Sequence, residues 1–226
     1  MDDATICYMC DSLATSREHV PPACFFPKVK GLGRDLRRNL ITVPSCERHN
    51  SLKSKDDEYL RAVIVMMSAR GNKVAQHQFW GKFRAATARK PHVYKSFFKD
   101  LGTVGKGQHR ALKIDRERFN SCIDHLSRAL FFHTYKRKWQ LPIKIVSPNL
   151  YSGVDSDQMV PHQPTLKLVE SLKQVLESQL IRGENPEVFK YRIHFDDKNE
   201  AYAFAAIFYD FFEVFSISAM QAVNGE

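Results

Sequence analysis

The sequence predicts an α+β protein, with a metal-binding N-terminal module followed by an α+β C-terminal domain. The 226 residues are 43% hydrophobic and 12% aromatic, which is enough apolar surface for a folded core. Cysteine and histidine recur near the N-terminus at metal-ligand spacing, and helical and strand-like periodicities alternate further along the chain. We divide the chain into a module at 1–75, a basic aromatic connector at 76–110 and an accessory domain at 111–226.

Charge is distributed unevenly along the chain. Residues 1–149 include 28 basic and 13 acidic residues, whereas residues 150–226 include 6 basic and 12 acidic residues. A basic part joined to an acidic part suggests that the basic part meets a polyanion, and nucleic acid is the usual candidate. A solvated basic surface without a partner would have the same composition.

The sequence argues against a membrane or secreted protein. No run of 18 apolar residues occurs, so neither a membrane-spanning helix nor a membrane partner is expected. The acidic N-terminus lacks the features of a signal peptide, which makes a cytoplasmic location the expectation. The five cysteines are an odd number, which argues against a disulfide framework.

Two close pairs of potential metal ligands lie in the first 50 residues. Cys7 and Cys10 form a C-x2-C pair, and Cys46 and His49 form a C-x2-H pair. Each pair can present two ligands from one tight turn, and four such ligands suit a tetrahedral structural zinc. Cys24 is a less favoured substitute ligand. The alternative is that these cysteines are small buried hydrophobes.

Between and after these pairs lies a further motif. Residues 18–22 read EHVPP, residues 39–40 read NL, and Asn50 directly follows His49. In order, spacing and residue type, residues 5–65 resemble the HNH endonucleases, whose fold is a zinc-stabilised ββα-metal module. With His49 as a zinc ligand, Asn50 is the last residue of an HNN-type variant. His49 could instead be the final histidine of the motif.

The resemblance implies a role for each motif residue. His19 would be the general base that takes a proton from water, and Asn39 would hold its ring through a hydrogen bond. Glu18 and Asn50 would bind one catalytic Mg²⁺ or Mn²⁺, which prefer hard oxygen ligands. Ordinary interpretations remain: Asn39 as a turn residue, Glu18 as a surface acid and Asn50 as a residue at the start of a helix.

Periodicity and turn residues predict the remaining elements. The expected stop at Gly71-Asn72 ends a helix that begins near Cys46, and we expect its acidic residues 56–58 to be solvated. Residues 196–199 (DDKN) predict a turn. The phenylalanine-rich segment at 202–217 could be a helix or a strand, and we favour a β-hairpin with 188–195. The predicted elements are strands at 39–45, 143–146, 188–195 and 202–217, and helices at 46–70, 116–138 and 164–182.

Basic residues suited to phosphate contacts lie in two segments. One is the glycine-containing loop at 28–38, and the other is the connector, where aromatic residues alternate with six basic residues between 76 and 99. An amphipathic helix that packs on the core through its aromatic residues is an equal alternative for the second segment. The candidate nucleic-acid contacts are Lys28, Lys30, Arg34, Arg37, Arg38, Lys82, Arg84, Arg89 and Lys90.

Together these observations predict a metal-dependent HNH endonuclease that cuts DNA, with a structural zinc and a catalytic Mg²⁺ or Mn²⁺. Family resemblance associates such proteins with defence systems or mobile elements. Two alternatives stay open. One is a zinc-stabilised nucleic-acid-binding protein without cleavage activity, and the other is a toxin-like nuclease that cuts RNA. The C-terminal domain is a candidate surface for a homodimer.

Overall fold

The computed structural model describes residues 5–27, 35–89, 101–104, 109–112, 114–150 and 163–219, and it has a mixed α+β fold. The N-terminal part begins with an antiparallel pair of strands, in which Glu18 lies opposite Val43 and His19 opposite Thr42. Short 3-10 turns and a long helix follow. The elements are β1 (Ser16–His19), η1 (Ala23–Phe25), β2 (Thr42–Ser45), η2 (Glu47–His49), η3 (Ser51–Lys53) and α1 (Ser54–Ser68).

Short helices and a two-stranded sheet follow α1. Asn72 begins the first of these helices, because its side chain accepts hydrogen bonds from the backbone N–H groups of Val74 (2.8 Å) and Ala75 (3.1 Å). The elements are α2 (Lys73–Gln78), the π-helix η4 (Phe79–Phe83), α3 (Arg84–Arg89), β3 (Leu101–Val104) and β4 (His109–Leu112). The connector therefore contains regular elements in its described residues.

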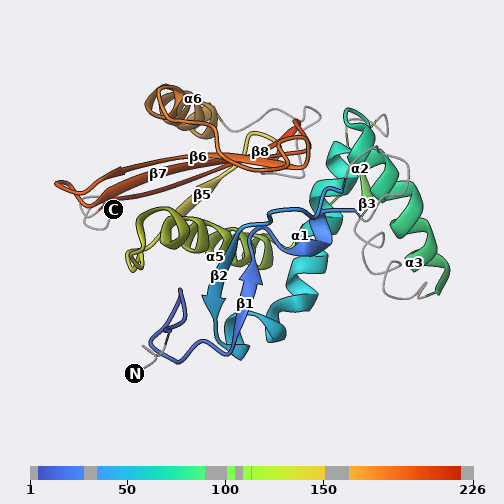
Figure 1. Ribbon diagram of the computed structural model, residues 1–226. Helices are drawn as coiled ribbons and strands as arrows, with labels where there is room; N and C mark the ends of the chain where they lie inside the picture. Colours follow the sequence, from blue (N-terminus) through green and yellow to red (C-terminus); the bar gives the residue numbers. More distant parts are fainter. Residues whose placement is uncertain are drawn as a thin grey trace.

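The C-terminal part is a four-stranded antiparallel sheet with the order β5-β8-β7-β6. Helix α6 covers one face of this sheet, and α5 lies on the opposite side, between the sheet and the N-terminal strands (Figure 1). The elements are α5 (Arg116–Tyr135), β5 (Lys144–Val146), α6 (Gln163–Glu177), β6 (Phe189–Asp196), β7 (Ala201–Phe208) and β8 (Phe212–Ala219).

The side chains of β7 show why each face takes a different helix. Tyr202, Phe204 and Phe208 belong to the large core that includes α5. Ala203 and Ala205 belong to a smaller core with α6. Successive strand residues point to opposite faces, so bulky residues fill the inner layer and alanines let α6 approach the outer face.

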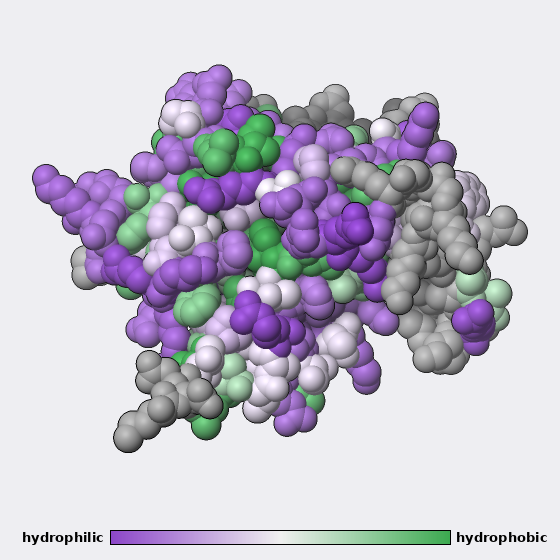
Figure 2. All heavy atoms as spheres, viewed as in Figure 1, coloured by the Kyte–Doolittle hydropathy of each residue, from purple (hydrophilic) through white to green (hydrophobic). Residues whose placement is uncertain are grey.

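One continuous core includes buried residues from the N-terminal module, from α2 and from the C-terminal sheet. The proposed division at residues 75 and 110 stays a prediction. On the face drawn in Figure 2 the surface is mostly hydrophilic, and apolar residues form small separate groups. Across the described ranges, no helix is both long and apolar enough to cross a bilayer.

Several sequence-based boundaries differ from the structure. The helix expected from Cys46 begins at Ser54, because two 3-10 turns come first. The expected single strand at 202–217 is two strands, and the chain turns through Tyr209 and Asp210, which both have positive φ angles. The predicted turn at 196–199 is confirmed, because it lies between β6 and β7.

A buried hydrogen-bonded group connects three distant segments. The Tyr209 hydroxyl donates to the carbonyl of Phe25 at 2.8 Å. The Gln78 amide donates to the Tyr209 oxygen at 3.0 Å and also to the Phe25 carbonyl. All three residues are fully buried, so this group joins the N-terminal module and α2 to the β7–β8 turn.

Tyr209→Phe is expected to destabilise the protein by about 1–3 kcal/mol, because it removes the hydroxyl from a buried carbonyl and a buried amide. The measurement is the midpoint of urea unfolding at constant m-value. Tyr135→Phe is the control, because the half-buried Tyr135 has no hydroxyl hydrogen bond within the described residues. A shift for Tyr209→Phe no larger than that of the control would contradict the prediction.

Candidate metal centre

Four side chains from the two predicted ligand pairs meet at one point. The ligand atoms of Cys7, Cys10, Cys46 and His49 all lie within 4.8 Å of one another. The sulfur atoms of Cys10 and Cys46 are 3.8 Å apart, and His49 Nδ1 lies 3.3 Å from Cys46 Sγ. Tetrahedral zinc with Zn–S bonds of about 2.3 Å separates two sulfurs by about 3.8 Å. The cluster therefore fits a structural zinc ion.

Local backbone structure positions both ligand pairs. The first pair lies in a loop that Ile6 and Leu13 close through an isolated bridge, and the Cys7 N–H donates to the Ser12 carbonyl at 3.0 Å. The second pair follows β2, where the His49 N–H donates to the Cys46 carbonyl at 3.1 Å. This 3-10 turn places both side chains on the same side of the chain.

Contacts beyond the module also hold the first loop. Lys138, beyond the end of α5, donates from Nζ to the Cys10 carbonyl at 2.7 Å and lies 2.9 Å from Asp11 Oδ1. The carbonyl contact connects the C-terminal part to the zinc ligands. The hydrogen bond from Lys138 lowers the pKa of Asp11, and the lysine charge lowers it further.

The environment shifts the pKa values of three side chains in the cluster, and the shifts of His49 and Cys10 favour their metal-binding forms. Burial lowers the pKa of His49, and electrostatic interactions with His125, Arg48 and Lys53 lower it further. A neutral imidazole is the form that binds a metal. Hydrogen bonds from Ser12 lower the pKa of Cys10, whereas burial raises that of Cys46. Cys24 lies outside the cluster, and its thiol contacts the Asp57 carbonyl at 3.7 Å.

Beside the cluster, Glu18 belongs to a buried group of charges. Its carboxylate lies 2.6 Å from Lys53 Nζ, and the same ammonium lies 2.6 Å from Asp57 Oδ1. Ser45 Oγ donates to Glu18 Oε2 at 3.4 Å. Burial raises the pKa of Glu18 although Lys53 lowers it, and Asp57 follows the same pattern. Burial alone would lower the pKa of Lys53, but the two carboxylates raise it.

His19 and Glu18 point to opposite faces of β1. Glu18 is buried, whereas Arg17 and His19 are exposed, as the alternation along a strand requires. The strand ends at His19, and Val20, Pro21 and Pro22 follow it. A single centre that uses both side chains is therefore not formed in this arrangement.

The two motif asparagines lie in different places. Asn50 follows His49 of the Cys3His cluster, and its amide donates to Ser16 Oγ at 2.8 Å and to the Arg17 carbonyl at 3.5 Å. It therefore lies against the strand that carries Glu18 and His19. Asn39 has a left-handed backbone conformation with φ of 53°. Within the described residues it makes no hydrogen bond to His19.

The candidate nucleic-acid contacts are only partly described. Arg37 donates from Nε to the Phe26 carbonyl at 2.8 Å, so part of its guanidinium supports the fold. Arg38 and Arg89 are exposed, the latter at the end of α3. Lys82 and Arg84 lie in η4 and α3, with only their backbone described. The other predicted contacts lie outside the described residues: Lys28, Lys30, Arg34 and Lys90.

Sequence reasoning missed Lys53 and the inward position of Asp57. The acidic residues 56–58 were expected on a solvated face, but the Asp57 side chain is only 18% exposed. Asp56 pairs with Arg118 of α5 at 2.7 Å. The i,i+4 spacing of Lys53 and Asp57 was an available signal. Nothing in the sequence showed that Glu18 would join them.

The fold and the site define an α+β protein with a Cys3His group that could hold a structural zinc ion. Comparison of the chain with protein-family models, with curated proteins and with solved structures gives no match.

Proposed function

We propose that this protein is a metal-dependent endonuclease of the HNH type that hydrolyses phosphodiester bonds in DNA. One observation carries the proposal: the Cys3His cluster holds Asn50 against β1, the strand that carries Glu18 and His19. A strand pair, a cluster with zinc geometry and a following helix are the parts of a ββα-metal module. The high basic charge of residues 1–149 supports a polyanionic substrate.

His19 is the proposed general base. It is exposed at the end of β1, so a water molecule and a phosphate can both reach its ring. Histidine suits proton transfer near neutral pH because its ordinary pKa is about 6.5. A divalent cation, when bound, would polarise the scissile phosphate and stabilise the leaving oxygen.

The proposed cation ligands need a rearrangement before they can act. Glu18 is 5% exposed and bound by Lys53, so the described arrangement does not fit Mg²⁺ or Mn²⁺ at this carboxylate. The Asn50 amide oxygen has no donor within the described residues, and it remains able to accept a contact. Glu18 would have to exchange the ammonium of Lys53 for the cation.

The same observation favours a second candidate function, which is zinc-stabilised nucleic-acid binding without cleavage. In that case Lys53 is the permanent partner of Glu18, and the exposed face of β1 serves for binding alone. The two candidates differ in whether the backbone of a bound strand is cut.

The test is cleavage of supercoiled plasmid with Mg²⁺, with Mn²⁺ or without added cation. We expect cation-dependent cutting by the wild type and a rate for His19→Ala lower by about 10²- to 10⁴-fold, because that range is typical of a lost general base. His77→Ala is the matched control, because His77 is exposed on α2. A structured RNA in a parallel reaction tests the RNA alternative.

Equal cutting by His19→Ala and the wild type would remove His19 from the chemistry. Plasmid binding by the wild type without cutting, in every cation condition, would establish the second candidate.

A further inference from the structure

A pocket lies where the N-terminal strands meet the C-terminal part. Its volume is about 410 Å³. The exposed side of β1–β2, the end of α5 and the segment before β6 form its walls. The lining residues are Arg17, Asn39, Leu40, Ile41, Thr42, His133, Lys136 and Glu184.

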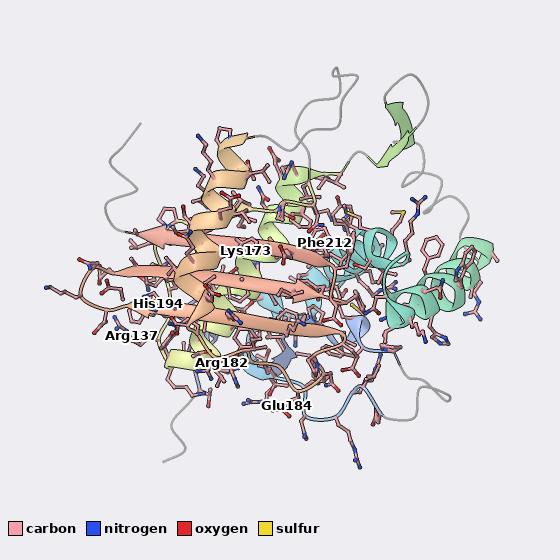
Figure 3. The ribbon with its side chains drawn as sticks, turned by 90° about the horizontal axis from the view of Figure 1, so that it is seen from above. Arg137, Lys173, Arg182, Glu184, His194 and Phe212 are labelled. Atoms are coloured by element: carbon pink, nitrogen blue, oxygen red, sulfur yellow. The ribbon has the colours of Figure 1, made fainter. Side chains whose placement is uncertain are left out.

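Two cations line this pocket: Arg17 comes from β1, and Lys136 follows α5. Arg182, which precedes β6, does not line the pocket but acts on its His133. Burial lowers the pKa of His133, and the charges of Lys136, Arg182 and Arg17 lower it further, in that order. His133 therefore lies within the electrostatic field of all three cations. Figure 3 shows Arg182 with Glu184 near the β6 edge of the sheet.

These cations have no carboxylate partner within the described residues. Other cations at this end of α5 are neutralised: Arg137 pairs with Asp197, and Lys138 pairs with Asp11. Glu184 lines the pocket but forms no ion pair with Arg17, Lys136 or Arg182 in the described part of the chain. The pocket thus retains positive charge, which suits an anionic group.

The donors in the pocket are positioned and only partly used. Arg17 donates from Nε to Thr42 Oγ1 at 2.9 Å and from Nη2 to the Thr42 carbonyl at 3.1 Å, so other N–H groups of its planar guanidinium remain available. Lys136 donates to the His133 carbonyl at 2.9 Å. This contact also covers one of the free carbonyls at the helix end, which would otherwise repel an anion.

We propose that this pocket binds a phosphate group of a nucleic-acid strand, next to the phosphate that is presented to His19. Arg17 and His19 project from the same face of β1, and residues two apart on a strand are separated by about 7 Å. Thr42, which holds the Arg17 guanidinium, is also the cross-strand partner of His19. When Arg17 and Lys136 bind one phosphate, the neighbouring phosphate of the same nucleic-acid strand therefore lies close to His19.

The inference rests on the proposed function, because it places the bound phosphate relative to His19. It extends the nucleic-acid interface beyond the two segments expected from the sequence, to the end of α5 and the loop before β6. It also assigns Asn39 to the wall of a binding pocket instead of a contact with the His19 ring.

The test is fluorescence anisotropy of a labelled DNA duplex with the full chain, without added divalent cation, over a series of salt concentrations. Lys136→Asn removes the charge, and asparagine tolerates the left-handed conformation of this residue, whose φ is 57°. We expect affinity to fall on the order of 10-fold, the value of one charge-assisted contact. The salt slope should fall by about one, because one phosphate contact is lost.

Lys198→Asn is the matched control, because Lys198 is exposed in the β6–β7 turn and loses the same charge. An equal effect of both substitutions, or an unchanged salt slope for Lys136→Asn, overturns the inference. A second readout is the His133 ring in NMR, whose pKa should rise when the duplex binds. If inorganic phosphate binds the pocket while Lys136→Asn leaves duplex binding unchanged, the pocket is a site for free phosphate and the inference is overturned.

The outcomes also separate this inference from the proposed nuclease activity. Plasmid cutting by the wild type, together with an unchanged slope for Lys136→Asn, overturns the pocket and leaves the nuclease standing. A reduced slope without any plasmid cutting supports phosphate binding and contradicts cleavage.

Discussion

Cys46→Ser is expected to abolish zinc binding and unfold the N-terminal module. Cys46 is 7% exposed and lies in the core, close to both Cys10 and His49. A serine hydroxyl is not a thiolate, so three ligands would have to hold the ion. Structural zinc contributes apparent binding free energies of about 10–16 kcal/mol in zinc-finger peptides. Losing the ion is therefore expected to remove more free energy than the other contacts of the module supply.

The size of the module explains this dependence. Its two strands have four residues each, and a two-stranded sheet is marginally stable by itself. The zinc cluster joins the loop before β1 to the 3-10 turn after β2. Without a metal, these segments would depend on the pairing of β1 with β2, on the Lys138 contact to the Cys10 carbonyl and on packing against α1 and α5.

The measurement is zinc content by mass spectrometry, together with limited proteolysis of residues 5–53. We expect about one zinc per wild-type chain, almost none in Cys46→Ser, and rapid cleavage of the N-terminal segment in the variant. Cys24→Ser is the control, because Cys24 is a half-buried thiol outside the cluster. Full zinc retention by Cys46→Ser would show that the cluster does not bind the ion through this residue.

Lys53→Met should lower the free energy of unfolding by about 3–5 kcal/mol at neutral pH, because removing one partner leaves buried charge uncompensated. The ammonium separates the carboxylates of Glu18 and Asp57, which are 7% and 18% exposed at their side chains. Without it, two negative groups face each other in a poorly solvated space.

The loss should become smaller in acid. Burial already raises the pKa of Glu18 and of Asp57, and the absence of Lys53 raises both further. A carboxyl group whose pKa is higher in the folded state than in the unfolded state gains stability as pH falls through the folded-state pKa. The difference between variant and wild type should therefore be smaller at about pH 5 than at about pH 7.

In the wild type, the lysine has the opposite dependence. Its pKa is raised in the folded state by the two carboxylates. Its contribution is therefore complete below the unfolded-state value of about 10.4 and is lost as pH rises through the folded-state pKa. Wild-type stability should decline in alkaline solution for this reason.

Urea unfolding at about pH 5 and pH 7 measures the loss for Lys53→Met, and unfolding of the wild type at a pH above about 10 measures the alkaline decline. Lys55→Met is the control, because Lys55 is exposed in the first turn of α1, two residues after Lys53, and it should change stability by less than about 0.5 kcal/mol. A loss below 1 kcal/mol for Lys53→Met, or one that does not depend on pH, would mean that solvent already screens the carboxylates.

The sequence alone predicted the two ligand pairs of the Cys3His cluster and much of the local structure. Two-residue spacing within each ligand pair is a property of a single turn, so Cys7, Cys10, Cys46 and His49 could be grouped without any tertiary information. The end of α1 near Gly71 and the turn at 196–199 follow from the same kind of local preference. The helix predicted at 116–138 is present as α5, although it ends three residues earlier.

Tertiary structure alone determined which side chains that are distant in the sequence contact one another. Periodicity indicates that a residue is buried but not what it contacts, so the pairing of Glu18 with Lys53 and of Tyr209 with Phe25 could not be predicted. The pocket at Arg17 and Lys136 likewise exists only because α5 packs beside β2. Local backbone preferences determine turns and elements, whereas the packing of distant faces determines how charges are neutralised and which remain available for a ligand.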